Sequence, residues 1–413
     1  MSLPKLAYLT GEYPRASDTF IQREVAALRA MGHDVLTCSI RTTGPEHLVG
    51  PEQREEHART FKVLDAAKRP LALLGAHLRW LRNPARYASA LRLAWKTASK
   101  GVMGRLYNLI YFAEAGILAA HLQEHGVTHL HNHIAKSSCT VAMLASALSG
   151  IPYSFTIHGP DIFFEPHHWR IDEKTRRARF VACISEFCRS QLMCFADQDD
   201  WRRLHIVHCG VDPMRYATAP HTGQHVVFVG RLAGVKGLPV LLEALHALDM
   251  PGLRVSLVGD GPDRAALEAE CARLGLADRV SFLGYRSQSE VAELLAEADV
   301  FVLPSFAEGV PVVLMEALAS GVPVVCTRIA GVAELVEQDQ SGVLVPPGDS
   351  AALAAAMQRL LADPHLRRLM GAAGQARVRE AFAIQTEAAR LSMLFEQYQD
   401  GAPTVPKRPE PRR

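Results

Sequence analysis

The sequence predicts an α/β fold built from two doubly wound parallel sheets. Short apolar runs alternate with amphipathic stretches along most of the chain. This alternation is typical of parallel strands that are covered by helices on both faces. At 413 residues the chain is longer than one hydrophobic core usually supports. Its 48% hydrophobic and 21% charged residues are typical of a globular protein. We therefore expect two domains.

The first domain is predicted at residues 1–212. Its first strand is expected at 5–10, and its first helix at 18–31, where apolar side chains recur at helical spacing. Asp18 is a suitable N-cap for that helix, and Gly32 would end it. Further strands are predicted at 34–39, 127–131, 153–157, 180–184 and 205–208.

The irregular stretch 213–224 is predicted to be a linker, and 225–375 a second domain that is doubly wound in itself. Its strands are expected at 225–229, 254–258, 280–283, 299–303, 322–326 and 342–345. Residues 401–413 are rich in proline and arginine, and we expect a disordered tail.

Composition excludes some classes of function. A net charge of +2 is too small for a dedicated nucleic-acid binder, and no window approaches the ~20 apolar residues of a membrane span. The first residues lack the apolar core of a signal peptide, so we expect a cytoplasmic protein. The eight cysteines show no CxxC pair and are expected to be reduced.

A basic insertion interrupts the first domain at residues 66–113, which we predict to form two helices. Such a stretch can pack on the domain with its cations in water, or it can lie on an anionic membrane surface. Its apolar residues include Trp80, Leu81, Trp95, Leu106 and Tyr107. It contains no acid and nine cations, namely Lys68, Arg69, Arg79, Arg82, Arg86, Arg92, Lys96, Lys100 and Arg105.

Two cations follow a predicted strand in VFVGRLAGVKG, residues 227–237. Arg231 and Lys236 flank the loop between that strand and the next helix. Ligands bind at the carboxyl ends of strands in open sheets, and the start of a helix favours anions. The pattern favours a diphosphate site, although a solvated basic loop would have the same sequence.

Two glutamates accompany a predicted strand-to-helix turn in SFAEGVPVVLMEALASGVPVV, residues 305–325. Glu308 lies in the turn, and Glu316 lies eight residues later inside the helix, flanked by apolar residues. Carboxylates beside a diphosphate can accept hydrogen bonds from ribose and hexose hydroxyls. The backbone N–H groups of Gly309 and Val310 can contact phosphate. The alternative is two surface glutamates, but a half-buried Glu316 needs partners.

These motifs together resemble the retaining GT-B glycosyltransferases of family 4. The E-x7-E pair, the Arg-x4-Lys before it and IAGVAELV…SGVLVPPGD carry the resemblance over nearly the whole second domain. The segments YPRASDTFIQREVAALRAMGHDV, HNHIAKSS and FTIHGPDIF resemble a narrower group, bacterial transferases of exopolysaccharide and colanic-acid-type synthesis. The resemblance implies two Rossmann-like domains that face each other across a cleft, with helices at 376–400 crossing back to the first.

The resemblance also implies the roles of donor-binding residues. Arg231 and Lys236 match the clamp on the donor diphosphate, and Glu316 matches the glutamate that holds the ribose hydroxyls. Glu308 matches the glutamate near the 3-hydroxyl of the transferred hexose. The backbone around Tyr285 and the neighbouring Arg286 would face the nucleobase.

The first domain is expected to supply the remaining site residues. His158 matches the family's histidine near the reacting centre, and with Glu308, Arg231 and Lys236 it completes the expected catalytic set. Gly11 and Asp161 are the expected acceptor-binding residues. The first loop, GEYPRASDTF, departs from the double-glycine turn that is common in such enzymes.

No metal or other cofactor is expected. His129, His131 and His133 would lie on one face of a strand, but no cysteine or carboxylate is spaced along the sequence to complete a closed site with them. No Asp-x-Asp pair is present, and VGDGP has too few glycines for a dinucleotide fingerprint.

The resemblance implies transfer of a hexose, with retention, from a UDP or GDP sugar to a lipid-linked saccharide in cell-surface polysaccharide synthesis. The protein would act at the inner face of the cytoplasmic membrane, without nucleic acid. The expected mechanism is departure of the diphosphate from the face that the acceptor attacks. Two alternatives remain from the sequence, a nucleotide-sugar 2-epimerase and an inactive subunit that binds sugar nucleotides.

Overall fold

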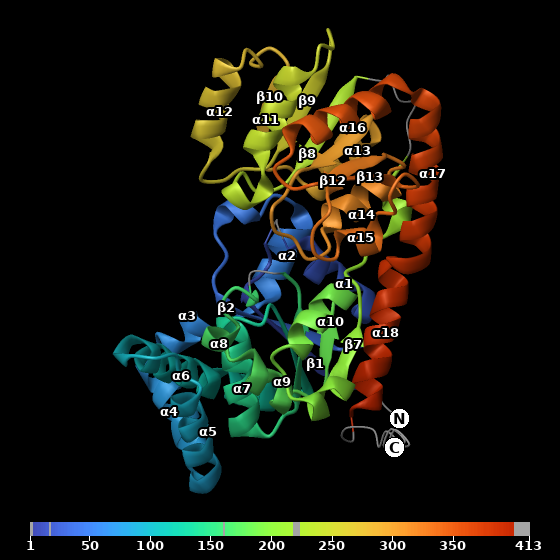
Figure 1. The fold of residues 1–413 in the computed structure, drawn as a ribbon. Coiled ribbons are helices and arrows are strands. Elements are labelled where there is room, and N and C mark those ends of the chain that lie inside the picture. Colours follow the sequence, from blue (N-terminus) through green and yellow to red (C-terminus); the bar gives the residue numbers. More distant parts are fainter. Residues whose placement is uncertain (1–2, 16–17, 160–161, 218–223, 400–413) are drawn as a thin grey trace, which may run out of the picture.

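The computed structural model describes residues 3–15, 18–159, 162–217 and 224–399, and it contains two parallel sheets (Figure 1). The first has seven strands in the order β3-β2-β1-β4-β5-β6-β7. Its strands are β1 (Leu6–Glu12), β2 (Val35–Arg41), β3 (Phe61–Lys62), β4 (His129–His133), β5 (Tyr153–Ile157), β6 (Val181–Cys183) and β7 (Leu204–Ile206). The order reverses between β1 and β4, which makes the carboxyl ends of these strands a place for ligands.

The second sheet has six strands in the order β10-β9-β8-β11-β12-β13, and its order reverses between β8 and β11. Its strands are β8 (His225–Val229), β9 (Arg254–Val258), β10 (Val280–Gly284), β11 (Val300–Leu303), β12 (Val324–Thr327) and β13 (Gly342–Val345). The predicted fold class, two doubly wound Rossmann-like domains, is confirmed.

Helices surround both sheets. Those of the first domain are α1 (Thr19–Ala30), α2 (Pro51–Arg59), α3 (Val63–Ala67), α4 (Pro70–Trp80), α5 (Pro84–Lys96), α6 (Val102–Glu124), α7 (Ser137–Ser149), α8 (Pro166–Trp169), α9 (Ile171–Arg177) and α10 (Glu186–Met193). Those that follow are α11 (Leu238–Ala247), α12 (Arg264–Arg273), α13 (Gln288–Ala296), α14 (Val312–Ala319), α15 (Val332–Leu335), α16 (Ser350–Ala362), α17 (Pro364–Ala381) and α18 (Ile384–Gln397).

The prediction of two helices in the basic insertion was wrong. Its residues form α4, α5 and the first half of α6, which makes three helices instead of two. Pro70 and Pro84 begin α4 and α5, where a missing N–H costs nothing, and Gly101, with φ 95°, precedes α6. Acids outside the stretch pair with two of its cations. Asp65 pairs with Lys68, and Glu124 pairs with Arg79.

The last helix returns to the first domain. In Figure 1, α17 and α18 run along one side of the molecule, and α18 lies beside α1. The ring of Phe395 lies 5.5 Å from that of Phe180 and 5.4 Å from that of His131. Glu387 accepts a 2.8 Å hydrogen bond from the backbone N–H of His208. Helix α18 is therefore part of the first domain's core.

Some predictions concern residues outside those that the structure describes. These are the acceptor-binding role of Asp161, positions 218–223 of the linker, and the disordered tail at 401–413. The domain boundaries at 212 and 375 stay predictions.

We expect Phe395→Ala to destabilise the protein by about 3 kcal/mol, because a fully buried phenylalanine leaves a cavity among the aromatic rings it packs against. Met393→Ala is the matched control, since Met393 is on the same helix and is 59% exposed. Thermal unfolding of both variants measures the difference. Equal melting temperatures would contradict the role assigned to α18.

Candidate active site

The two domains meet at the carboxyl ends of β5 and β11. Gly309, in the loop after β11, packs against the backbone of His158, which follows β5. A Cβ atom on Gly309 would lie 2.2 Å from the carbonyl oxygen of His158, closer than real Cβ atoms approach. The expected donor loop therefore touches the expected catalytic histidine directly.

The expected diphosphate clamp lies at the switch point of the second sheet. Lys236 Nζ lies 2.5 Å from Glu308 Oε1, and Ser305 Oγ donates a 2.6 Å hydrogen bond to the same oxygen. Both ionic side chains are largely buried. Arg231 is exposed, and no ion pair joins it to an acid within the described part of the chain. Glu308 therefore neutralises Lys236, the cation that is predicted to bind the diphosphate.

Backbone contacts hold the two loops of this clamp together. Gly237 has φ 66°, and a Cβ there would lie 2.0 Å from the carbonyl oxygen of Pro304. The N–H of Phe306 donates a 2.7 Å hydrogen bond to the carbonyl of Val235. The close approach of the two loops requires glycine at position 237. It brings together Lys236 and Glu308, which are 72 positions apart in the sequence.

Glu316 is paired across the domain interface with Arg23, which sequence reasoning missed. Arg23 Nη2 lies 2.5 Å from Glu316 Oε1 and also donates to Tyr216 and Gln288. Both charged side chains are about nine-tenths buried. Burial lowers the pKa of Arg23, but Glu316 raises it, and the net shift is upward. Arg23 therefore stays charged and holds the carboxylate that is predicted to bind ribose.

Arg23 also has unused hydrogen-bonding capacity. Among the described residues, its Nε and Nη1 have no hydrogen-bond partner. No local motif in the sequence could have identified the pair, because Arg23 and Glu316 are 293 positions apart.

The expected nucleobase end of the site is exposed. Tyr285 is 38% exposed, and the His47 ring of the first domain lies 6.0 Å from it. Arg286 Nε lies 3.8 Å from Glu290.

Gly11, an expected acceptor-binding residue, lies inside β1, which runs two residues past the predicted strand end. Nothing lies within 4 Å of where its Cβ would be. Its acceptor-binding role stays a prediction.

His158 is connected to the interior by hydrogen bonds. Its Nε2 lies 2.9 Å from His133 Nδ1, and His133 Nε2 lies 3.1 Å from Glu24 Oε1. Tyr8 donates a 2.7 Å hydrogen bond to the same Glu24 oxygen. Burial lowers the pKa of His158 well below its ordinary value, with His133 as a smaller cause. The His158 ring is therefore neutral.

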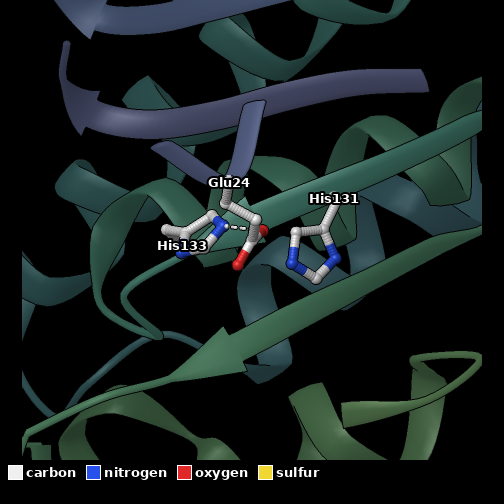
Figure 2. Close-up of side chains that lie close together, drawn as sticks. All are labelled: Glu24, His131 and His133. Carbon is white, nitrogen blue, oxygen red and sulfur yellow. Dashed lines mark hydrogen bonds and ion pairs between the residues drawn. The ribbon is translucent and has the colours of Figure 1, made fainter. Parts of the chain in front are cut away.

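Glu24, His131 and His133 lie close enough together to suggest a metal site. One ligand atom from each lies within 4.8 Å of the others, and Figure 2 shows the Glu24 carboxylate between the two rings. Contrary to the prediction from the sequence, a carboxylate does accompany these histidines, because the fold brings Glu24 from 109 positions away. However, Ser154 and Thr156 already contact both ring nitrogens of His131. The absence of a metal stays a prediction.

Comparison with known proteins identifies the family of the chain. Residues 215–377 match the model of glycosyl transferases group 1, and residues 96–215 match that of glycosyltransferase family 4. The chain is 31% identical to alpha-D-kanosaminyltransferase of Streptomyces kanamyceticus, over 59% of this chain and 69% of that protein. The chain belongs to glycosyltransferase family 4. The resemblance seen in the sequence is thus confirmed.

Other matches extend over more of this glycosyltransferase. It is 27% identical to the amylovoran biosynthesis glycosyltransferase AmsK of Erwinia amylovora, over 86% of this chain and 90% of that protein. The crystal structure of HepE from Anabaena, in complex with UDP and glucose, matches with a TM-score of 0.74 at 20% identity. That match covers 96% of this chain and all of HepE, and it confirms the GT-B fold.

We expect Lys236→Ala to reduce turnover at least tenfold, about 1.4 kcal/mol of transition-state stabilisation, because a leaving diphosphate loses its cation. Lys5→Ala is the control, since Lys5 is likewise paired with a carboxylate but lies before β1, away from the site. Steady-state kinetics on folded variants measures the effect. Wild-type turnover in Lys236→Ala would contradict the clamp.

We expect Glu316→Ala to weaken binding of free nucleoside diphosphate, because ribose contacts form before the reaction. Glu308→Ala should lower turnover more than nucleotide affinity, because its hexose contact is absent from the free nucleotide. Calorimetric titration with UDP and GDP separates the two roles. Glu316→Gln, which keeps a side chain of the same size beside Arg23, controls for loss of the buried partner. Equal losses of affinity in the two alanine variants would show that the roles are wrongly assigned.

Proposed function

We propose that this enzyme transfers a hexose, with retention of the anomeric configuration, from a UDP or GDP sugar to a lipid-linked saccharide. The observation that carries the proposal is the clamp at the second sheet's switch point, beside His158. A cation and two carboxylates at this place suit the diphosphate, hexose and ribose of such a donor. The name of AmsK, an amylovoran biosynthesis glycosyltransferase, supports a role in polysaccharide synthesis, and the HepE complex supports a UDP sugar.

The reaction proceeds by departure of the diphosphate on the face that the acceptor hydroxyl attacks. Arg231 and Lys236 stabilise the negative charge that develops on the leaving group. Lys236 exchanges its contact with Glu308 for one with the diphosphate, which leaves Glu308 to accept a hydrogen bond from the hexose. The leaving diphosphate helps to remove the proton of the acceptor hydroxyl, and no metal ion is needed.

Incubation with radiolabelled sugar nucleotides and a membrane extract tests this function. Transfer of label into a lipid-linked product supports it. Interconversion of sugar nucleotides without transfer would indicate an epimerase, and nucleotide binding without either reaction would indicate an inactive subunit. The anomeric configuration of the product decides whether transfer proceeds with retention.

The enzyme is further proposed to bind the inner face of the cytoplasmic membrane through the insertion α4–α6. Among the described helices, none is long and apolar enough to cross a membrane. Helices α4, α5 and α6 gather on the side of the first domain that is away from the second (Figure 1). One face of α4 exposes Leu71, Leu74, Leu78 and Leu81, and the start of α6 exposes Val102, Met103, Leu106 and Tyr107.

Charge accompanies this exposed apolar surface. Arg82, Arg92 and Lys96 are exposed on or beside α5, and Arg105 lies 4.7 Å from the ring of the half-exposed Trp95. Trp80, unlike Trp95, is partly buried, and its indole donates a hydrogen bond to the carbonyl of Gly116. Exposed apolar side chains with flanking cations suit an anionic lipid surface.

We expect the enzyme to co-sediment with liposomes that contain anionic lipid, and less so at high salt because salt screens the attraction. Replacing Arg82 and Arg92 by serine should weaken binding by about 2 kcal/mol, about thirtyfold. The control replaces Arg368 and Arg379, two exposed arginines of α17, by serine. No binding to anionic liposomes at low salt would contradict the membrane proposal and favour a soluble acceptor.

A further inference from the structure

Four side chains form a continuous hydrogen-bonded chain from the interior to the domain interface. They are Tyr8 on β1, Glu24 on α1, His133 at the end of β4 and His158 after β5. The first three are buried, and His158 is partly exposed against Gly309 of the second domain. The family resemblance gave a role only to His158, and hydrogen bonds in this structure connect the other three side chains to it.

Tyr8 sets the direction of the first hydrogen bond, and the Glu24 carboxylate sets that of the second. Burial, followed by the charge of Glu24, raises the pKa of Tyr8 well above its ordinary value, so its hydroxyl stays protonated and donates. The Glu24 carboxylate accepts, and therefore His133 donates to it from Nε2–H. When His133 carries this proton alone, its lone pair is on Nδ1, which accepts the hydrogen bond from Nε2–H of His158.

This order leaves Nδ1 of His158 as the ring atom that can accept another hydrogen bond. Its contact there is Cys209 Sγ, at 3.5 Å. Burial raises the pKa of the Cys209 thiol, so this group stays a thiol, which is a weak donor. A sugar hydroxyl is a stronger donor and can replace it.

We propose that Glu24 and His133 are positioning residues that fix the tautomer of His158, so that its Nδ1 accepts a hydrogen bond from a sugar hydroxyl at the transfer site. The inference rests on the proposed function and names the atom through which His158 acts. Neighbouring rings hold the same orientation, since Phe20 lies 4.8 Å from the His158 ring. The arrangement uses an anion, an orienting histidine and a neutral histidine, each fixed by the one before it.

A metal on Glu24 and His133 would require the opposite order. It would take the lone pair of His133 Nε2 and put the proton on Nδ1, which would then donate to His158. A doubly protonated His133 would have the same effect. The tautomer of His158 therefore distinguishes these arrangements from the proposed one.

Nitrogen-15 NMR of histidine-labelled enzyme reads the tautomer directly, with the His158 signals assigned by their loss in His158→Ala. We expect the proton on Nε2 in the resting enzyme. A proton on Nδ1, or stoichiometric zinc in the purified protein that is lost in Glu24→Gln, would overturn the proposal.

Kinetics of His133 variants tests whether the tautomer serves the reaction. We expect His133→Leu to lower kcat at least tenfold, to leave UDP affinity within twofold, and to mix the tautomers of His158. His133→Asn places an amide oxygen near the former Nδ1 position, so it should restore the Nε2–H tautomer and most of the activity. His158→Ala should abolish transfer with little change in nucleotide affinity.

His129→Leu is the matched control for folding. His129 is also buried on β4, but it contacts Ser154 and the rings of Phe180 and Phe395 instead of the chain to His158. Equal losses of kcat in His129→Leu and His133→Leu, or an unchanged kcat in His133→Leu, would overturn the proposal. A wild-type enzyme with the expected tautomer that transfers no sugar would contradict the proposed function instead, since the NMR result does not depend on turnover.

Discussion

The backbone contact between Gly309 and His158 is the constraint on which the site depends. Parallel sheets place the carboxyl ends of their strands along one edge. Here two such edges approach so closely that position 309 has no room for a side chain beside the backbone of His158. Because of this approach, the clamp residues of one domain and the histidine chain of the other lie at one interface. The ion pair between Arg23 and Glu316 crosses the same interface.

Two buried ion pairs lie at or near the interface. Lys236 pairs with Glu308 within the second domain, while Arg23 pairs with Glu316 across the two. Burying such groups unpaired would cost several kcal/mol each. A donor that binds here must therefore replace existing partners instead of filling an empty polar site. Its hydroxyls and phosphates have the hydrogen-bonding capacity to do so.

The sequence predicted the fold class correctly, and it assigned roles to the donor loops that stay predictions; both inferences rest on local pattern. Apolar periodicity locates strands, and Lys236, Glu308 and Glu316 lie in contiguous motifs that the family shares. Glu24 and Arg23 lay beyond such reasoning, since their partners are 109 and 293 positions away and only the packed α1 brings them together. The helix count in the insertion was a different kind of error. Pro70, Pro84 and Gly101 mark the starts of the three helices, and such residues are signals for a helix boundary.

The return of α18 has a consequence for the order in which the protein folds during synthesis. The ribosome makes all strands of the first sheet before residues 384–397, yet Phe395 and Tyr398 complete the packing around Phe180. Helix α1 already packs on this face of the sheet through Ile21, Val25 and Leu28. The part around Phe180 and His129 lacks its cover until α18 is made. Until α18 emerges, this part of the face is available to chaperones and to other nascent chains. The N-terminal domain is therefore synthesised before the second domain, but its core is complete only when the C-terminal helix has been made.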